Sequence, residues 1–72
     1  MTTKYKHIHF KEVVSALKDK RCYKCMNNKS SAVLGEIFYY TPWRKYVFSM
    51  TEDAVFDESC LRDIIDFLEQ LK

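Results

Sequence analysis

Apolar residues in the last third of the chain recur at the spacing of an amphipathic helix. The stripe consists of Leu61, Ile64, Ile65, Leu68 and Leu71, and it is widened by Cys60 and Phe67. This pattern predicts a helix over residues 58–71 whose apolar side packs on the rest of the fold. Asp57 is placed to cap this helix, and Glu58 with Arg62 forms a favourable i,i+4 pair on it.

Two segments before the helix carry the signals of a β-hairpin. Residues 35–40 and 45–50 are rich in aromatic and β-branched side chains, which favour strands. The intervening residues 41–44 suit a tight turn with Pro42 at its second position. We therefore expect the two segments to pair as antiparallel strands.

A two-residue turn in this hairpin decides which side chains share a face of the sheet. The side chains predicted to lie under the helix are the pairs Tyr39 with Tyr46 and Ile37 with Phe48. Those predicted to face away from it are the pairs Tyr40 with Lys45 and Phe38 with Val47, together with Lys24 and Met26. Because one helix covers one side of a sheet, the second face, which is aromatic and basic, is left for a partner.

The segments before the hairpin are less regular. Residues 21–28 are interpreted as a strand, and the polar residues 27–31 as the loop that follows it. The N-terminal segment is ambiguous between a strand over residues 5–10, which we favour with a possible helical turn after it, and a helix. The residues that fit the helical alternative are Phe10, Val13, Val14 and Leu17.

These elements predict an α+β fold in one small domain over residues 1–72. The sheet is an antiparallel meander of three to four strands, and the C-terminal helix packs on one face. A chain of 72 residues has room for only a thin core, so we expect a homodimer. No apolar run is long enough for a membrane helix or a signal peptide, so we expect no membrane association and a cytoplasmic location.

Charge is divided unevenly along the sequence. Residues 1–48 carry ten Lys and Arg against three Asp and Glu, a net charge of +7. Residues 49–72 carry two against seven, a net charge of −5. This division indicates either a basic surface for phosphates or an acidic partner, or two halves that attract each other within the fold.

Metal and redox chemistry are not expected. Cys22 and Cys25 form a C-x-x-C pair, and His7 with His9 completes an imaginable zinc site. In a strand, however, residues three apart point to opposite faces, so the two sulfurs do not converge. We expect free thiols, as in a reducing cytoplasm, and no metal or cofactor.

Enzymatic activity is not expected either. The sequence has no Gly-rich phosphate loop, no G-x-S-x-G and no H-E-x-x-H. Its only glycine, Gly35, suits a strand start or a bulge.

Aromatic and basic residues are interleaved around the hairpin turn. Base stacking combined with phosphate contacts uses such a pattern, although a hairpin core or a protein interface uses it as well. In the ligand hypothesis, a base stacks on an exposed ring and phosphates meet the neighbouring cations. The candidate ligand-binding residues are Lys24, Phe38, Tyr40, Trp43, Arg44 and Lys45.

From Tyr5 onward the sequence resembles a group of small uncharacterised proteins encoded by bacteriophages and prophages. The resemblance is carried by residues 34–37, 40–48 and 55–71, which include the Trp43-Arg44 turn and a Cys-Leu-x-Asp-Ile helix. The chain departs from the group around Cys22 and Cys25 and in residues 13–17.

The resemblance implies a phage accessory protein that acts by stoichiometric binding in the cytoplasm of the host cell. The leading hypothesis is counter-defence, by sequestering a nucleotide signal or by inhibiting a host defence protein, which would be acidic. The alternative is a nucleic-acid-binding accessory protein of the phage cycle, and a third hypothesis is a structural dimer without a ligand.

Overall fold

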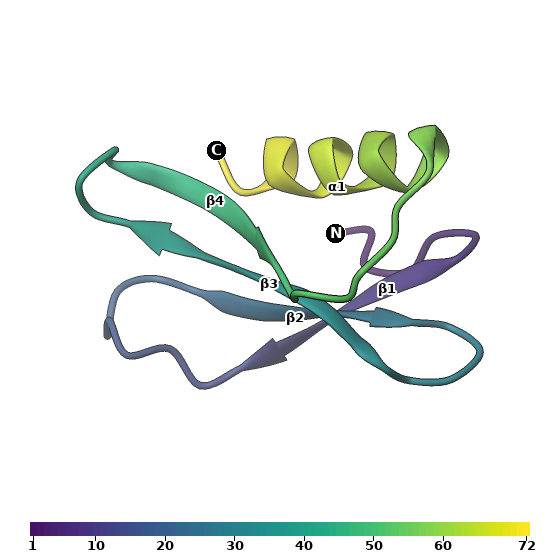
Figure 1. Cartoon of the computed structure of the whole chain (residues 1–72). Helices are drawn as coiled ribbons and strands as arrows, with labels where there is room; N and C mark the ends of the chain where they lie inside the picture. The colour runs from purple at the N-terminus through teal and green to yellow at the C-terminus, as the bar shows by residue number, and fades with distance from the viewer.

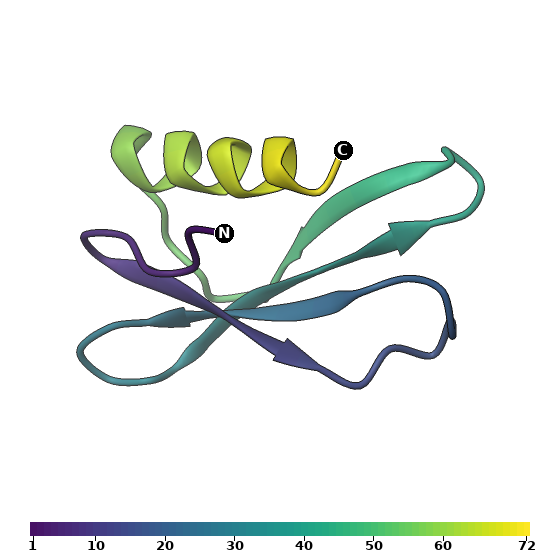
Figure 2. The same ribbon diagram turned by 180° about the vertical axis from the view of Figure 1, so that it is seen from behind.

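Four antiparallel strands follow one another in chain order across a single sheet, and one helix covers one face of that sheet (Figure 1). The computed structural model describes all of residues 1–72. The elements are β1 (Ile8–Val13), β2 (Cys22–Asn27), β3 (Val33–Tyr40), β4 (Lys45–Met50) and α1 (Glu58–Gln70). Seen from both sides, the face turned away from α1 carries no further element (Figure 2). The predicted meander with a C-terminal helix is confirmed.

The β3–β4 hairpin has the predicted register. Tyr39 pairs with Tyr46 and Tyr40 pairs with Lys45, so the loop between the strands has four residues rather than two. Two overlapping turns close this loop: the Trp43 N–H donates to the Tyr40 carbonyl and the Arg44 N–H donates to the carbonyl of residue 41, each at 3.1 Å. Loops of four residues built around such turns are common in hairpins, and the longer loop leaves the pairing unchanged.

β1 starts later than its alternation predicted. It begins at Ile8 rather than Tyr5 and continues to Val13. The residues before it turn back along the strand, because the Tyr5 N–H donates to the Ile8 carbonyl and the Phe10 N–H donates to the Thr3 carbonyl, both at 2.8 Å. These bonds hold residues 3–5 beside β1 and prevent them from extending it.

The N-terminal segment is also tied to α1. The Gln70 side chain accepts from the Thr2 N–H at 2.8 Å and donates to the Thr2 carbonyl at 2.9 Å. The Tyr5 hydroxyl donates to Asp66 at 2.7 Å. The helical alternative for the segment after β1 is wrong, since residues 14–21 form an irregular connection in which Val14 is exposed.

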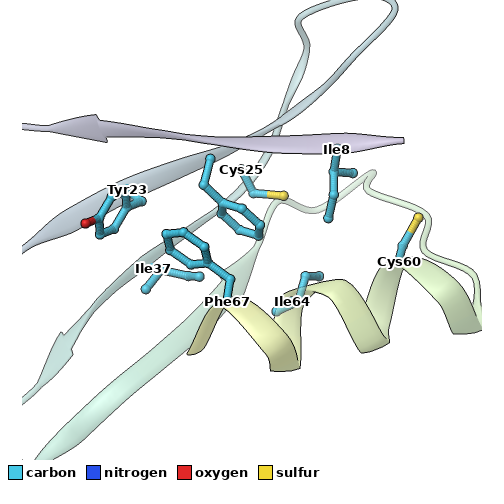
Figure 3. Close-up of a cluster of buried hydrophobic side chains, with 8 residues drawn as sticks. Ile8, Tyr23, Cys25, Ile37, Cys60, Ile64 and Phe67 are labelled. Carbon is cyan, nitrogen blue, oxygen red and sulfur yellow. The ribbon is translucent and has the colours of Figure 1, made fainter. Parts of the chain in front are cut away.

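The core lies between α1 and the sheet, with side chains from β1, β2 and β3 pointing toward the helix (Figure 3). Its buried residues are Ile8, Phe10, Tyr23, Cys25, Ile37, Cys60, Ile64 and Phe67. Phe67 is fully buried, with its ring stacked on Phe10 at 4.1 Å between centroids and edge-on to Tyr23 at 4.8 Å. This aromatic cluster is the main attachment of α1 to the sheet.

The buried side of α1 is rotated from the predicted apolar stripe by about one residue position. Cys60, Ile64 and Phe67 are the buried residues of α1. Leu61 and Ile65, which we expected in the core, are 47% and 56% exposed. The apolar side of α1 is therefore wider than the surface that the sheet covers.

Gly35, the only glycine, lies at an irregularity of the sheet, in agreement with the predicted strand start or bulge. The register between β2 and β3 shifts beside it, from Cys25 opposite Gly35 to Met26 opposite Val33. A Cβ at this position would lie 2.6 Å from the Ser49 carbonyl oxygen and 2.6 Å from the Phe48 ring. The backbone contact cannot be relieved by turning a side chain, so the absence of a Cβ is required here.

Gly35→Ala is expected to lower the free energy of unfolding by about 1–3 kcal/mol through overpacking. Urea denaturation followed by circular dichroism measures the change. Glu36→Ala, at the next and exposed position of β3, is the matched control and should leave stability nearly unchanged. Equal effects of the two substitutions would contradict the close approach of β3 and β4 at Gly35.

Asp57 caps α1 as predicted. Its Oδ1 accepts from the Cys60 N–H at 2.8 Å, and this bond, with that from the Ser59 hydroxyl, lowers the pKa of the carboxyl to about 2. The predicted Glu58–Arg62 ion pair is also present on the next turn.

The cap gives a pH prediction. Because the folded pKa of Asp57 lies below its unfolded value, the stabilisation is present above about pH 4 and is lost as the pH falls toward 2. Asn caps as well as Asp but does not titrate, so Asp57→Asn should lose less stability than the wild type over that interval. Thermal unfolding at a series of pH values compares the two. If both proteins lose the same stability between about pH 4 and pH 2, the Asp57 carboxylate is not the group whose titration weakens the cap.

Candidate functional site

The face of the sheet away from α1 is solvent-accessible, and we refer to it as the open face. By strand alternation it carries His9, Lys11, Val13, Cys22, Lys24, Met26, Glu36, Phe38, Tyr40, Lys45, Val47 and Ser49. Four of the predicted ligand-binding residues, Lys24, Phe38, Tyr40 and Lys45, belong to this face by alternation. The rings of Phe38, Tyr40 and Trp43 follow one another edge to face, at 6.5 Å and 5.1 Å between centroids, toward the hairpin turn.

A cavity lies on the other side of the sheet, at the C-terminal end of α1. Figure 1 shows the β3–β4 hairpin, the β1–β2 connection and the last turn of the helix on the same side of the molecule, and residues of all three line the cavity. The cavity has a volume of about 270 Å³. The residues that line it are Lys20, Tyr39, Arg44, Lys45, Tyr46, Leu68, Leu71 and Lys72.

Two tyrosines form the aromatic wall of this cavity. Tyr39 and Tyr46 are cross-strand partners, and their rings lie 5.4 Å apart at an angle of 81°. The Lys20 ammonium sits 4.3 Å from the centroid of the Tyr39 ring, a cation–π contact. The Tyr46 hydroxyl accepts from the Arg21 N–H at 3.1 Å, which fixes the second ring. The wall is therefore held by the sheet and by the β1–β2 connection together.

The charged side chains of the lining are all basic. They are Lys20, Arg44, Lys45 and Lys72, and no Asp or Glu lines the cavity. Lys72 pairs with Glu69 at 3.2 Å, whereas the other three make no ion pair. Lys20 and Arg44, with Lys45 at the margin of the cavity, produce a positive local potential that favours an anionic ligand.

Arg44 has an unusual backbone conformation. Its φ is 53°, in the left-handed region that Gly and Asn adopt with least strain. A hairpin loop does not require a guanidinium at this position, and Gly would relieve the conformational cost. The strain is consistent with a use for the Arg44 side chain at the mouth of the cavity.

The structure divides the predicted ligand-binding residues between two surfaces. Arg44 lines the cavity, while Lys24, Phe38 and Tyr40 lie on the open face. Lys45, the first residue of β4, borders the cavity, although alternation directs its side chain to the open face with Tyr40. Trp43 is 65% exposed at the turn and contacts Tyr40.

The remaining residues of the cavity were not among the predicted ligand-binding residues. Tyr39 and Tyr46 were predicted to face α1, and the helix was predicted to end near Leu71. Together these two predictions would have indicated an aromatic wall beside the end of the helix. Lys20 gave no such signal, because it belongs to an irregular connection.

The cysteines do not gather into a site. Cys25 is buried under α1, whereas Cys22 lies on the open face, as strand alternation predicted. Burial, with a smaller effect of Cys60, raises the pKa of the Cys25 thiol to about 12. No group of three or more His, Cys, Asp or Glu side chains lies close enough to hold a metal ion.

Comparisons with known protein families, with curated proteins and with solved structures found no match to this chain. The structure contains no helix with the length and hydropathy needed to cross a membrane.

Proposed function

We propose that the protein is a non-enzymatic binding protein that holds a small phosphate-bearing ligand, a nucleotide, in the cavity at the end of α1. The observation that carries the proposal is the lining itself, which combines two tyrosine rings with basic residues and includes no Asp or Glu. Ligand sites combine an apolar or aromatic wall with a few convergent polar groups, and this cavity has both.

The two parts of a nucleotide match the two parts of the lining. Phosphate oxygens are strong acceptors for Lys and Arg, and Arg44 offers a planar, bidentate contact. The base or sugar lies against Tyr39 and Tyr46 and the apolar ends of Leu68 and Leu71. The volume of about 270 Å³ is small beside the roughly 300–1,000 Å³ of most ligand pockets, so we propose a ligand of mononucleotide size.

The biological role rests on the resemblance to small phage proteins. A protein without catalytic groups that binds one nucleotide per chain acts by lowering the free concentration of that nucleotide. In the cytoplasm of an infected cell, such a protein sequesters a nucleotide signal of the host defence. Inhibition of an acidic host defence protein through the same basic residues is the other form of this proposal.

Titration of the purified chain with nucleotides tests the proposal. Mononucleotides and cyclic mono- and dinucleotides are the ligands, and the parent nucleosides are the matched controls without phosphate. Nucleotides should change the emission of Trp43, which adjoins Arg44, and should raise the melting temperature. A ligand at one hundred times its Kd adds about 2.7 kcal/mol of stability, which is easily measured. If no nucleotide changes either signal, the proposal fails.

A second function is favoured by the ring series on the open face. Phe38, Tyr40 and Trp43 offer successive stacking surfaces, and Lys24 lies on the same face. Single-stranded nucleic acid is bound by such combinations of stacked bases and backbone contacts. Its affinity should fall steeply with salt through counterion release, whereas a nucleotide in the cavity should show a shallower dependence. Titrations with oligonucleotides at several salt concentrations distinguish the two functions.

A further inference from the structure

The two edges of the sheet differ in how they are protected. On β1, the outward carbonyl of Ile8 accepts from Tyr5, and the outward N–H of Phe10 donates to Thr3. The N-terminal segment therefore occupies the first half of that edge. No chain segment pairs with the outer edge of β4, which is the last strand of the sheet. An unpaired edge of this kind is a template for another strand.

The hydrogen bonds of β3 show which groups of β4 point outward. The Thr51 N–H donates to the Leu34 carbonyl at 2.9 Å, directly beyond the end of β4 and in the same register. Bonded and non-bonded pairs alternate in an antiparallel ladder, so Ser49 and Val47 also direct their backbone groups toward β3. The backbone groups of Tyr46, Phe48 and Met50 consequently point away from the sheet.

None of these outward groups has a hydrogen-bond partner outside the regular elements. The strand also lacks the usual protections of an edge, since it contains no proline and no bulge and has a single charge, Lys45, at its first residue. Its remaining side chains are neutral, and Met50 is 56% exposed. β4 is therefore an apolar edge strand with its hydrogen-bonding groups unpaired.

We propose that β4 pairs antiparallel with β4 of a second copy of this chain, about a two-fold axis at Phe48. This register sets Tyr46 opposite Met50 of the partner subunit and Phe48 opposite Phe48 of the partner subunit. It uses the outward groups of all three residues on both chains. The partners are two aromatic residues and a methionine, whose cross-strand contacts are favourable, and the two Lys45 side chains lie at opposite ends.

Charge favours this edge over the open face as the site of self-association. A two-fold contact places identical patches against each other. On the open face such a contact would bring together Lys11 and Lys24 of both copies, with Glu36 as the only acid in that row. Along the edge of β4, no like charges meet. Only 9 of 72 residues are buried. A chain with so small a core gains stability when pairing with a second copy buries more apolar surface.

The mass in solution and the exchange of the outward amides test the inference. Light scattering across the micromolar range should give twice the 8.7 kDa of one chain. Hydrogen exchange should show the amides of Tyr46 and Phe48 protected in the dimer, and this protection should decrease on dilution. A wild-type monomer overturns the inference. So does a dimer in which both amides exchange as freely as unpaired ones, because that dimer would use another surface.

A proline substitution at the edge gives the matched variants. Met50→Pro removes an outward N–H without removing a bond to β3, whereas Met50→Ala keeps that N–H. The proline variant should weaken dimerisation by about tenfold or more, since the two-fold axis removes two bonds at once. The alanine variant should remain dimeric. Equal dimerisation of the two variants contradicts the inference, which is independent of any ligand in the cavity.

Discussion

Phe67→Ala is expected to lower the free energy of unfolding by about 3–5 kcal/mol. Phe67 is the only helical residue with no exposed side-chain surface, and its ring contacts both Phe10 and Tyr23. Truncation removes these aromatic contacts and leaves a cavity between α1 and the sheet, which cannot close because the strands are fixed by their ladders. A small domain has a total stability near the low end of about 5–15 kcal/mol, so a large part of it would be lost.

Urea denaturation of Phe67→Ala and Leu61→Ala measures this difference. Leu61 lies on the same helix and is 47% exposed, so its truncation should change stability by less than about 1 kcal/mol. If the two variants lose equal stability, or if Leu61→Ala is the less stable one, α1 docks through the side of the helix that the sequence stripe first indicated.

Arg44→Gly is expected to weaken nucleotide binding by roughly 10- to 150-fold without lowering the melting temperature. The loss in affinity follows from removing charge-assisted hydrogen bonds to phosphate, worth about 1.5–3 kcal/mol. The retained stability follows from the φ of 53°, which Gly adopts without the strain that Arg carries. If Arg44 had only a structural role, its replacement would not weaken nucleotide binding while leaving the melting temperature unchanged.

Titration calorimetry and thermal unfolding of three variants measure the separation. Arg44→Lys keeps the charge but not the bidentate geometry, so its affinity should fall between those of the wild type and Arg44→Gly. Lys24→Ala, on the open face, is the control for general loss of positive charge and should bind the nucleotide nearly as well as the wild type. Equal losses at Arg44 and Lys24 would point to non-specific attraction by a basic surface.

The hairpin could be predicted from the sequence because its signals agree. The proline turn and the alternating aromatic residues both indicate the same register, so Tyr39 was correctly paired with Tyr46. The start of β1 was not predictable from alternation. Tyr5 and Ile8 fit a strand equally well, and only the hydrogen bonds that fold residues 3–5 back along β1 separate them.

The side of α1 that docks could not be read from the pattern either. Apolar residues cover so wide a part of the helix that neighbouring positions such as Leu61 and Ile64 qualify equally. The choice is made by packing against Phe10 and Tyr23, which lie far away in the sequence. The apolar spacing predicts the helix and Asp57 its cap, whereas tertiary contacts select the side of the helix that is buried.

The cavity depends on three segments that are distant in the sequence. Arg44 and Lys45 were predicted as phosphate contacts from the interleaving around the turn, and they line the cavity. The predicted stacking residues Phe38 and Tyr40 lie on the opposite side of the sheet, because alternation separates them from Tyr39. Lys20 is brought to the cavity by a connection without periodicity, which no local pattern predicts.

A two-dimensional NMR titration with a nucleotide is the sharpest test of a nucleotide site in the cavity, because it reports the binding surface residue by residue. For a nucleotide bound in the cavity, we expect the largest shifts at Lys20, Tyr39, Arg44 and Tyr46, and much smaller ones with the matching nucleoside. Lys24 on the open face should remain unchanged. Shifts that follow the open face instead, or no shifts with any nucleotide of the panel, would contradict a nucleotide site in the cavity.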